Sequence, residues 1–262
     1  MALYSHSKIS TFEQCKLKYQ MKYIQKLKPD FEKTIEAHLG TCVHDVLEWL
    51  YSEVLNGRIP SLDQVVLKYQ EIWGETYNEG FSIAKWGMKE EDYFKKGVKF
   101  VVDYYIKHQP FNDGTIALEK QIYVELHPEF PHKITGFIDR LVLNPKTGEY
   151  EIHDYKTAST MPDKEKIEAD RQLALYSIAI KQTYGADKSV LLTWHYLNHN
   201  MQIFSRRTDE QLENLKKDIM NLIREIEVTK GFNANISKLC EWCEYNKSCP
   251  AFGKKNFQTT IL

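Results

Sequence analysis

The sequence has almost no net charge and no long apolar run, and each absence removes a class of protein. Lysine and arginine total 35 against 36 aspartates and glutamates in 262 residues, so any binding to a polyanion must come from local patches. No apolar stretch approaches the ~20 residues of a membrane span, and MALYSHSKIS lacks signal or transit-peptide character. We therefore expect a cytoplasmic protein without a membrane partner.

Two further absences concern ATP and disulfides. The phosphate-binding pattern G-x4-G-K-[ST] is missing, so the chain is not expected to hydrolyse ATP or to unwind a duplex by itself. Five cysteines are an odd number, which suits a reducing compartment better than a disulfide framework. Four of them can be grouped as a metal set, and Cys42 then remains as a core thiol.

Three of these cysteines lie in LCEWCEYNKSCPAF near the end of the chain. Cys240, Cys243 and Cys249 follow the pattern C-x2-C-x5-C, with a proline directly behind the last. Three thiolates are one short of a closed tetrahedral site, and four could hold zinc or an iron-sulfur cluster. The polar residues between them argue against ordinary core cysteines.

The period of the apolar residues changes after about residue 110, from helical to alternating. Capping boxes at Ser10, Ser61 and Thr208 predict three helix starts. Together these patterns predict a mixed α/β core with helical additions at both ends. The expected helices are one from Ser10, 36–56, 61–78, 89–108, about 164–184 and one from Thr208; the expected strands are 115–126, 133–143, 149–157, 189–197 and 201–207.

Two of the predicted strands carry carboxylates at positions where a bound cation would offset the cost of their charge. Asp154 and Lys156 are two apart and so share one strand face. Asp139 lies in a strand that is apolar on both faces, where a lone carboxylate costs several kcal/mol unless it is paired or holds a cation. Two neighbouring carboxylates favour Mg²⁺ or Mn²⁺, and such a site suits phosphodiester hydrolysis. The alternative is a plain Lys–Asp ion pair at a strand end.

The order of these motifs resembles the RecB-like branch of the PD-(D/E)XK nucleases. The elements GTCVH, GFID, DYK and QLALY follow one another as the family pattern requires. The resemblance implies a single domain with a restriction-endonuclease-like mixed sheet flanked by helices. It assigns metal binding to His44, Asp139, Asp154 and the backbone carbonyl of Tyr155, catalysis to Lys156 with Asp139 and Asp154, and site support or DNA contact to Gln172, Tyr176 and Glu119.

The cysteines extend the resemblance to a subset that includes AddB and CRISPR-associated RecB-like exonucleases. In that subset, one upstream and three downstream cysteines hold a 4Fe-4S cluster. The resemblance makes Cys15, on the first predicted helix, the fourth ligand, so the cluster would join the two chain ends. Zinc remains the alternative. The expected segments are a cluster-ligand helix in 1–35, a helical insertion in 50–110, a nuclease core in 115–206, and a helix with the cysteine motif in 207–262.

The expected function is a metal-dependent nuclease acting on DNA, as an exonuclease on single-stranded ends. Lysines and tyrosines interleave from Lys16 to Lys28, a composition that suits either a phosphate backbone with stacked bases or a solvated helix face. The alternatives are a non-catalytic DNA-binding or assembly subunit, and a processing nuclease of CRISPR spacer acquisition. Partners in recombination, repair or CRISPR adaptation would then be expected.

Overall fold

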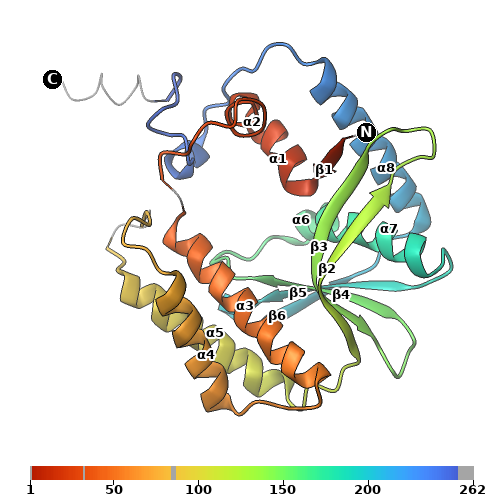
Figure 1. The fold of residues 1–262 in the computed structure, drawn as a ribbon. Coiled ribbons are helices and arrows are strands. Elements are labelled where there is room, and N and C mark those ends of the chain that lie inside the picture. The colour runs from red at the N-terminus through yellow and green to blue at the C-terminus, as the bar shows by residue number, and fades with distance from the viewer. Residues whose placement is uncertain (1, 32, 84–86, 253–262) are drawn as a thin grey trace.

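A six-stranded mixed sheet lies at the centre of the protein (Figure 1). The computed structural model describes residues 2–31, 33–83 and 87–252. The strand order is β1-β3-β4-β5-β6, with β2 paired to β3, and β4 and β5 run parallel. The strands are β1 (Leu3–Ser5), β2 (Thr115–Glu125), β3 (Lys133–Leu143), β4 (Tyr150–Lys156), β5 (Val190–Tyr196) and β6 (Met201–Ser205).

Helices form two groups, each with its own buried apolar cluster. One group consists of α3, α4 and α5, and the other contains α1, α7 and α8, which pack with the sheet (Figure 1). Helix α7 is apolar on all sides because it is buried between the sheet and α8. The helices are α1 (His6–Gln14), α2 (Lys16–Tyr19), α3 (Ile35–Leu55), α4 (Leu62–Thr76), α5 (Glu90–His108), α6 (Lys164–Glu168), α7 (Gln172–Tyr184) and α8 (Asp209–Val228).

Short helical turns complete the described chain. A π-helical turn, Gln20–Ile24, follows α2, and two 3-10 turns cover Leu197–His199 and Lys238–Trp242. Across the described ranges, no helix combines the length and the apolar character that a membrane crossing requires.

The predicted mixed core is confirmed, and the capping boxes at Ser61 and Thr208 form as expected. The prediction at Ser10 was wrong, because the first helix begins after Ser5, whose Oγ accepts the Lys8 N–H at 3.1 Å. Strand β1 was missed, since three residues are too few for a visible alternation.

The expected single helix over 164–184 is broken into α6 and α7. Asp170 lies at the break, and its carboxylate accepts the backbone N–H of Leu173 at 3.2 Å, which starts a new helix. The break matters for the site, because it places Gln172 at the beginning of α7.

Candidate metal-dependent active site

The GFID segment lies where one edge of β3 has no strand beside it. Strand β2 pairs along nearly the whole of β3 and occupies one edge. On the other edge, β1 pairs with residues 133–135 and β4 pairs with residues 140–143. Within the described chain, residues 136–139 are therefore left without a strand neighbour on that side. Because β3 and β4 separate here, side chains from several elements can enter between them.

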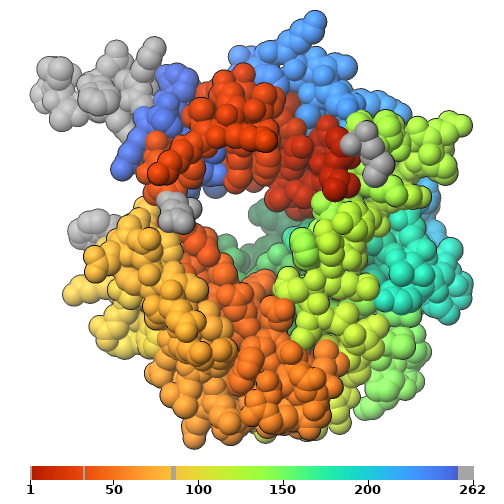
Figure 2. Space-filling model, viewed as in Figure 1, coloured from red at the N-terminus to blue at the C-terminus, as the bar shows by residue number. Residues whose placement is uncertain are grey.

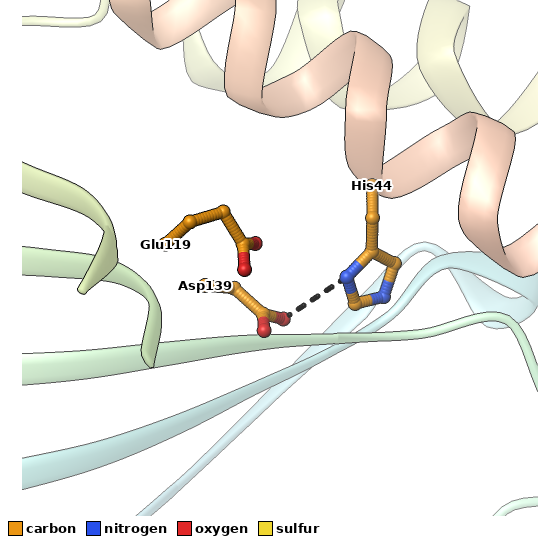
Figure 3. Close-up of side chains that lie close together, drawn as sticks. All are labelled: His44, Glu119 and Asp139. Atoms are coloured by element: carbon orange, nitrogen blue, oxygen red, sulfur yellow. Dashed lines mark ion pairs between the residues drawn. The ribbon is translucent and has the colours of Figure 1, made fainter. Parts of the chain in front are cut away.

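His44, Glu119 and Asp139 converge at this place from three different elements (Figure 3). One ligand atom from each lies within 4.8 Å of the other two, and the Nδ1 of His44 lies 3.4 Å from an Asp139 oxygen. His44 projects from α3 toward the two carboxylates on β2 and β3 (Figure 3). Helix α3 thus closes one side of the group.

Glu119 reaches the group through an uncommon backbone conformation. Its φ is +41°, in the left-handed region that residues with a side chain seldom adopt. The neighbouring residues Leu118 and Lys120 pair with Arg140 and Ile138, so Glu119 faces Asp139 across the two strands. Burial, and then the charge of Asp139, raise the pKa of Glu119 to about 7. Strain and charge repulsion concentrated at one place are typical of a functional site.

The backbone of Tyr155 connects this group to β4. Its N–H donates to an Asp139 oxygen at 3.0 Å, and its carbonyl accepts from the Nε2 of His44 at 2.8 Å. A carbonyl can only accept, so Nε2 carries a hydrogen, and Nδ1 is the ring nitrogen that faces the carboxylates. The carbonyl that the resemblance proposed as a ligand is therefore next to the Nε2 of His44, whereas Nδ1 lies next to Asp139.

Lys156 and Asp154 form an ion pair next to the group. The Nζ of Lys156 lies 2.8 and 3.0 Å from the two Asp154 oxygens and 3.4 Å from the amide oxygen of Gln172. Burial raises the pKa of Asp154 to about 6, and Asp139 adds to the effect while Lys156 opposes it. Burial lowers the pKa of Lys156, but the charge and hydrogen bond of Asp154, together with the charges of Asp170 and Asp139, outweigh it and the net shift is upward. The lysine is thus held as a cation beside the carboxylates.

Gln172 and Tyr176 support this pair from α7. The Gln172 amide nitrogen donates to the Tyr176 hydroxyl at 3.3 Å. Tyr176 also lies against Gly136, where an added Cβ would come within 2.6 Å of the tyrosine ring. The first residue of the GFID segment must therefore be glycine if Tyr176 is to keep this position.

Arg140 is a supporting residue that the motif analysis missed. It is fully buried, its Nε donates to the Tyr155 hydroxyl at 2.9 Å, and it pairs with Asp113. These bonds fix the side chain of the residue whose backbone connects His44 and Asp139. An arginine directly after Asp139, in a strand apolar on both faces, was the available signal, because a buried guanidinium requires partners.

The donor atoms fit a divalent cation. One imidazole nitrogen, two carboxylates and a nearby backbone carbonyl form a set dominated by hard oxygen ligands, which Mg²⁺ and Mn²⁺ prefer. Burial is the main cause of the raised pKa of both Glu119 and Asp154, and the charge of Asp139 adds to it, so a bound cation would oppose both shifts. The carboxylate of Asp154 lies outside the 4.8 Å group and is bonded to Lys156 instead.

The four cysteines Cys15, Cys240, Cys243 and Cys249 line one cavity between the two chain ends. Cys15 accepts the backbone N–H groups of Lys18 and Asn235, each at 3.5 Å. Cys42 lies elsewhere, buried on α3. The expectation that Cys15 lies within the first helix was wrong. It joins α1 to α2 in an extended conformation with φ −161°.

The lysines after Cys15 face carboxylates of the C-terminal segment. Lys18 and Lys22 both pair with Glu244, and Lys16 pairs with Glu225. Tyr19 is buried in the core. The contacts therefore favour the solvated-face interpretation of this segment over a track for DNA.

An imidazole, carboxylates and a lysine at the divergence of two strands define a metal-dependent hydrolase type of centre. The sequence profile described as the PD-(D/E)XK nuclease superfamily matches residues 4–250, and the chain belongs to this superfamily. Among curated proteins, none matches the sequence significantly.

A solved structure shows the same fold at low sequence identity. A structure described as a "putative exonuclease" from Eubacterium rectale has a TM-score of 0.52 and 15% identity, covering 92% of this chain and 87% of the other. The structure titled SSO0001 has a TM-score of 0.43 and 12% identity, covering 93% and 85%.

Proposed function

We propose that the protein is a Mg²⁺- or Mn²⁺-dependent deoxyribonuclease of the RecB-like branch, acting as an exonuclease on single-stranded ends. One observation carries the proposal: His44, Glu119 and Asp139 converge beside the Asp154–Lys156 pair, within motifs of a nuclease superfamily. Asp154 is included in the proposed site because its carboxylate can turn toward the cation when Lys156 contacts substrate.

The residues divide the work by their chemistry. His44, Glu119, Asp139 and the Tyr155 carbonyl would hold the cation, which supplies Lewis-acid stabilisation of the charge that develops on the phosphate. Lys156 orients the attacking water or stabilises that charge, and Gln172 holds the lysine in place.

The shape of the molecule supports action on strand ends. Figure 2 shows an opening bordered by the N-terminal helices, α3 and the β2–β3 strands. A flexible single strand can enter such an opening by its end more easily than a stiff duplex can. An exonuclease works from such an end.

We further propose that Cys15, Cys240, Cys243 and Cys249 hold a 4Fe-4S cluster that joins the two chain ends. Among the described residues, the three-member group with ligand atoms within 4.8 Å is the carboxylate site, and no cysteines form such a group. Four sulfurs on one zinc ion would lie about 3.8 Å apart, given Zn–S bonds of ~2.3 Å. In a 4Fe-4S cluster each thiolate binds a different iron, so the four thiolates lie farther apart, and hydrogen bonds to the sulfurs such as those to Cys15 occur at such clusters. The free cysteines suit a reducing compartment such as the cytoplasm.

Digestion of a labelled single-stranded oligonucleotide tests the nuclease proposal. With Mn²⁺ or Mg²⁺ the protein should shorten it stepwise, and a chelator should stop the reaction. Asp154→Asn should lower the rate more than about 100-fold, because Lys156 loses its charged partner and the site loses a carboxylate. Asp187→Asn, an exposed change, is the matched control. Full activity in Asp154→Asn at an unchanged melting temperature would refute the mechanism.

The same assay separates the other candidate functions. A DNA-binding or assembly subunit would change the mobility of the oligonucleotide by binding it and would leave it uncut with either Mn²⁺ or Mg²⁺. A processing nuclease of CRISPR spacer acquisition would trim overhangs on a duplex and stop at the paired region. Partners in recombination, repair or CRISPR adaptation would follow from whichever substrate is preferred.

A further inference from the structure

One face of the β2–β3 pair is exposed and carries aromatic side chains. Residues of the opposite face, such as Ile122, Val124 and Ile134, are buried in the core. On the exposed face, Phe137 and Tyr123 are 50% and 49% exposed. A strand face open to water is usually polar, so two half-exposed aromatic rings on it call for an explanation.

These rings lie in a row that begins at the proposed metal site. Phe137 is two residues before Asp139 and therefore points to the same face. It pairs directly with Gln121, and Tyr123 pairs with Thr135 in the next position outward. Residues on adjacent strands that are diagonal to each other lie ~7–8 Å apart, within reach of aromatic side chains. The order along the face is thus carboxylates, Phe137 and then Tyr123.

Phe137 also lines a cavity of about 450 Å³ beside the start of α7. The end of β1 supplies Ser5 to its wall, the start of α1 supplies His6 and Ser7, and α7 supplies Gln172 and Tyr176. Gln172 is the residue that contacts Lys156. The volume lies in the ~300–1,000 Å³ range of ligand sites, and the mixture of one apolar ring with hydroxyl and amide groups suits a nucleotide.

We propose that Phe137 stacks on a base of the single strand beside the scissile phosphate, and that Tyr123 stacks on a further base along the same face. Stacking suits every base, because each has a π-face, so these rings would hold a strand without selecting its sequence. The proposal rests on the nuclease function and adds the part of the substrate that the metal site does not contact. It also explains why apolar rings remain exposed on this face.

Affinity measurements with abasic oligonucleotides test the proposal. We would follow fluorescence anisotropy of labelled single strands with Ca²⁺ and the Asp154→Asn chain, so that the substrate stays intact. One series carries a single abasic nucleotide at successive positions from the end. Phe137→Ala should weaken binding of the complete strand about 5- to 100-fold, and Phe137→Trp should restore it. Phe204→Ala, another half-exposed phenylalanine on the edge strand β6, is the matched control.

The abasic series identifies the contact. An abasic nucleotide at one position should weaken binding to the chain that keeps Phe137 and should have no further effect in Phe137→Ala. For Tyr123→Ala, the position without further effect should be a different one. Equal losses at every position, or unchanged affinity in Phe137→Ala, would overturn the stacking proposal while leaving the nuclease intact. If neither the Asp154→Asn chain nor the unsubstituted chain binds any single strand, the nuclease proposal and the stacking proposal are both overturned.

Discussion

The carboxylate site and the cysteine cavity hold their ligands in opposite ways. His44 belongs to a 21-residue helix, and Glu119 and Asp139 belong to 11-residue strands paired to each other. Cys15 joins two helices, and Cys240 lies in a five-residue 3-10 turn. The first site is built from long elements of the core, and the second from short segments at the chain ends.

The bonds around each site show the same contrast. At the carboxylate site, His44 and Asp139 are both bonded to the Tyr155 backbone, and Arg140 fixes the Tyr155 side chain. Around the cysteines, the bonds join short segments of the two chain ends, such as the Asp30 N–H to the Glu244 carbonyl at 2.8 Å and the Lys18–Glu244 ion pair. The comparison teaches that long paired elements position the carboxylates without a cation, whereas the cysteine region is where the proposed cluster would add most to stability.

Removal of a cysteine should have the largest effect on stability. If the four thiolates hold the proposed cluster, Cys240→Ser should lose it and lower the free energy of unfolding by more than about 3 kcal/mol, because the cluster would join the two chain ends. Iron and zinc analysis with an absorbance spectrum and a melting curve would measure this. Cys42→Ala should keep the metal content. A colourless protein carrying one zinc would refute the cluster, and an unchanged melting temperature would refute its structural role.

Acid should destabilise the sheet region through His108 by about 2 kcal/mol at pH 5. Burial, aided by Arg140, lowers the pKa of His108 to about 3. The unfolded chain binds the proton with a pKa of ~6.5, so this stability is complete above that pH and is lost as pH falls from ~6.5 toward 3.

The histidine effect can be isolated by substitution. His108→Gln should reduce the difference in unfolding free energy between pH 7 and pH 5 by about 2 kcal/mol, measured by urea titration. The exposed His127→Gln is the control and should leave the difference as it is. An identical pH response in His108→Gln would mean that other groups carry the acid sensitivity.

Neutralisation of Glu119 should produce the smallest effect, and one of opposite sign. At pH 8 without a cation, Glu119→Gln removes a half-buried charge and its repulsion with Asp139, and because solvent screens much of both effects the free energy of unfolding should rise by only about 1 kcal/mol. Metal affinity should fall at the same time. Unfolding in a chelator and a Mn²⁺ titration measure the two changes, with the exposed Glu129→Gln as the control. A lower free energy of unfolding in Glu119→Gln would contradict the view that the fold holds the charges of Glu119 and Asp139 together against their repulsion.

Much of the fold could be predicted because its signals are local. The long helices α3, α4 and α5 and all strands except β1 lie within one or two residues of the expected ranges. The errors fall where a short contact decided the outcome, as with Ser5 at the first helix and Asp170 at the break before α7. Such hydrogen bonds leave little trace in the pattern of apolar residues.

The sequence by itself determined the mixed core, the order of the motifs and the pairing of Asp154 with Lys156, since two residues on one strand share a face wherever the strand lies. Only the tertiary structure decided that Glu119 joins His44 and Asp139, that Arg140 supports Tyr155, and that Cys15 shares a cavity with three distant cysteines. The physical reason is range: spacing along the chain orders side chains within one element, and strand pairing and helix packing bring separate elements together.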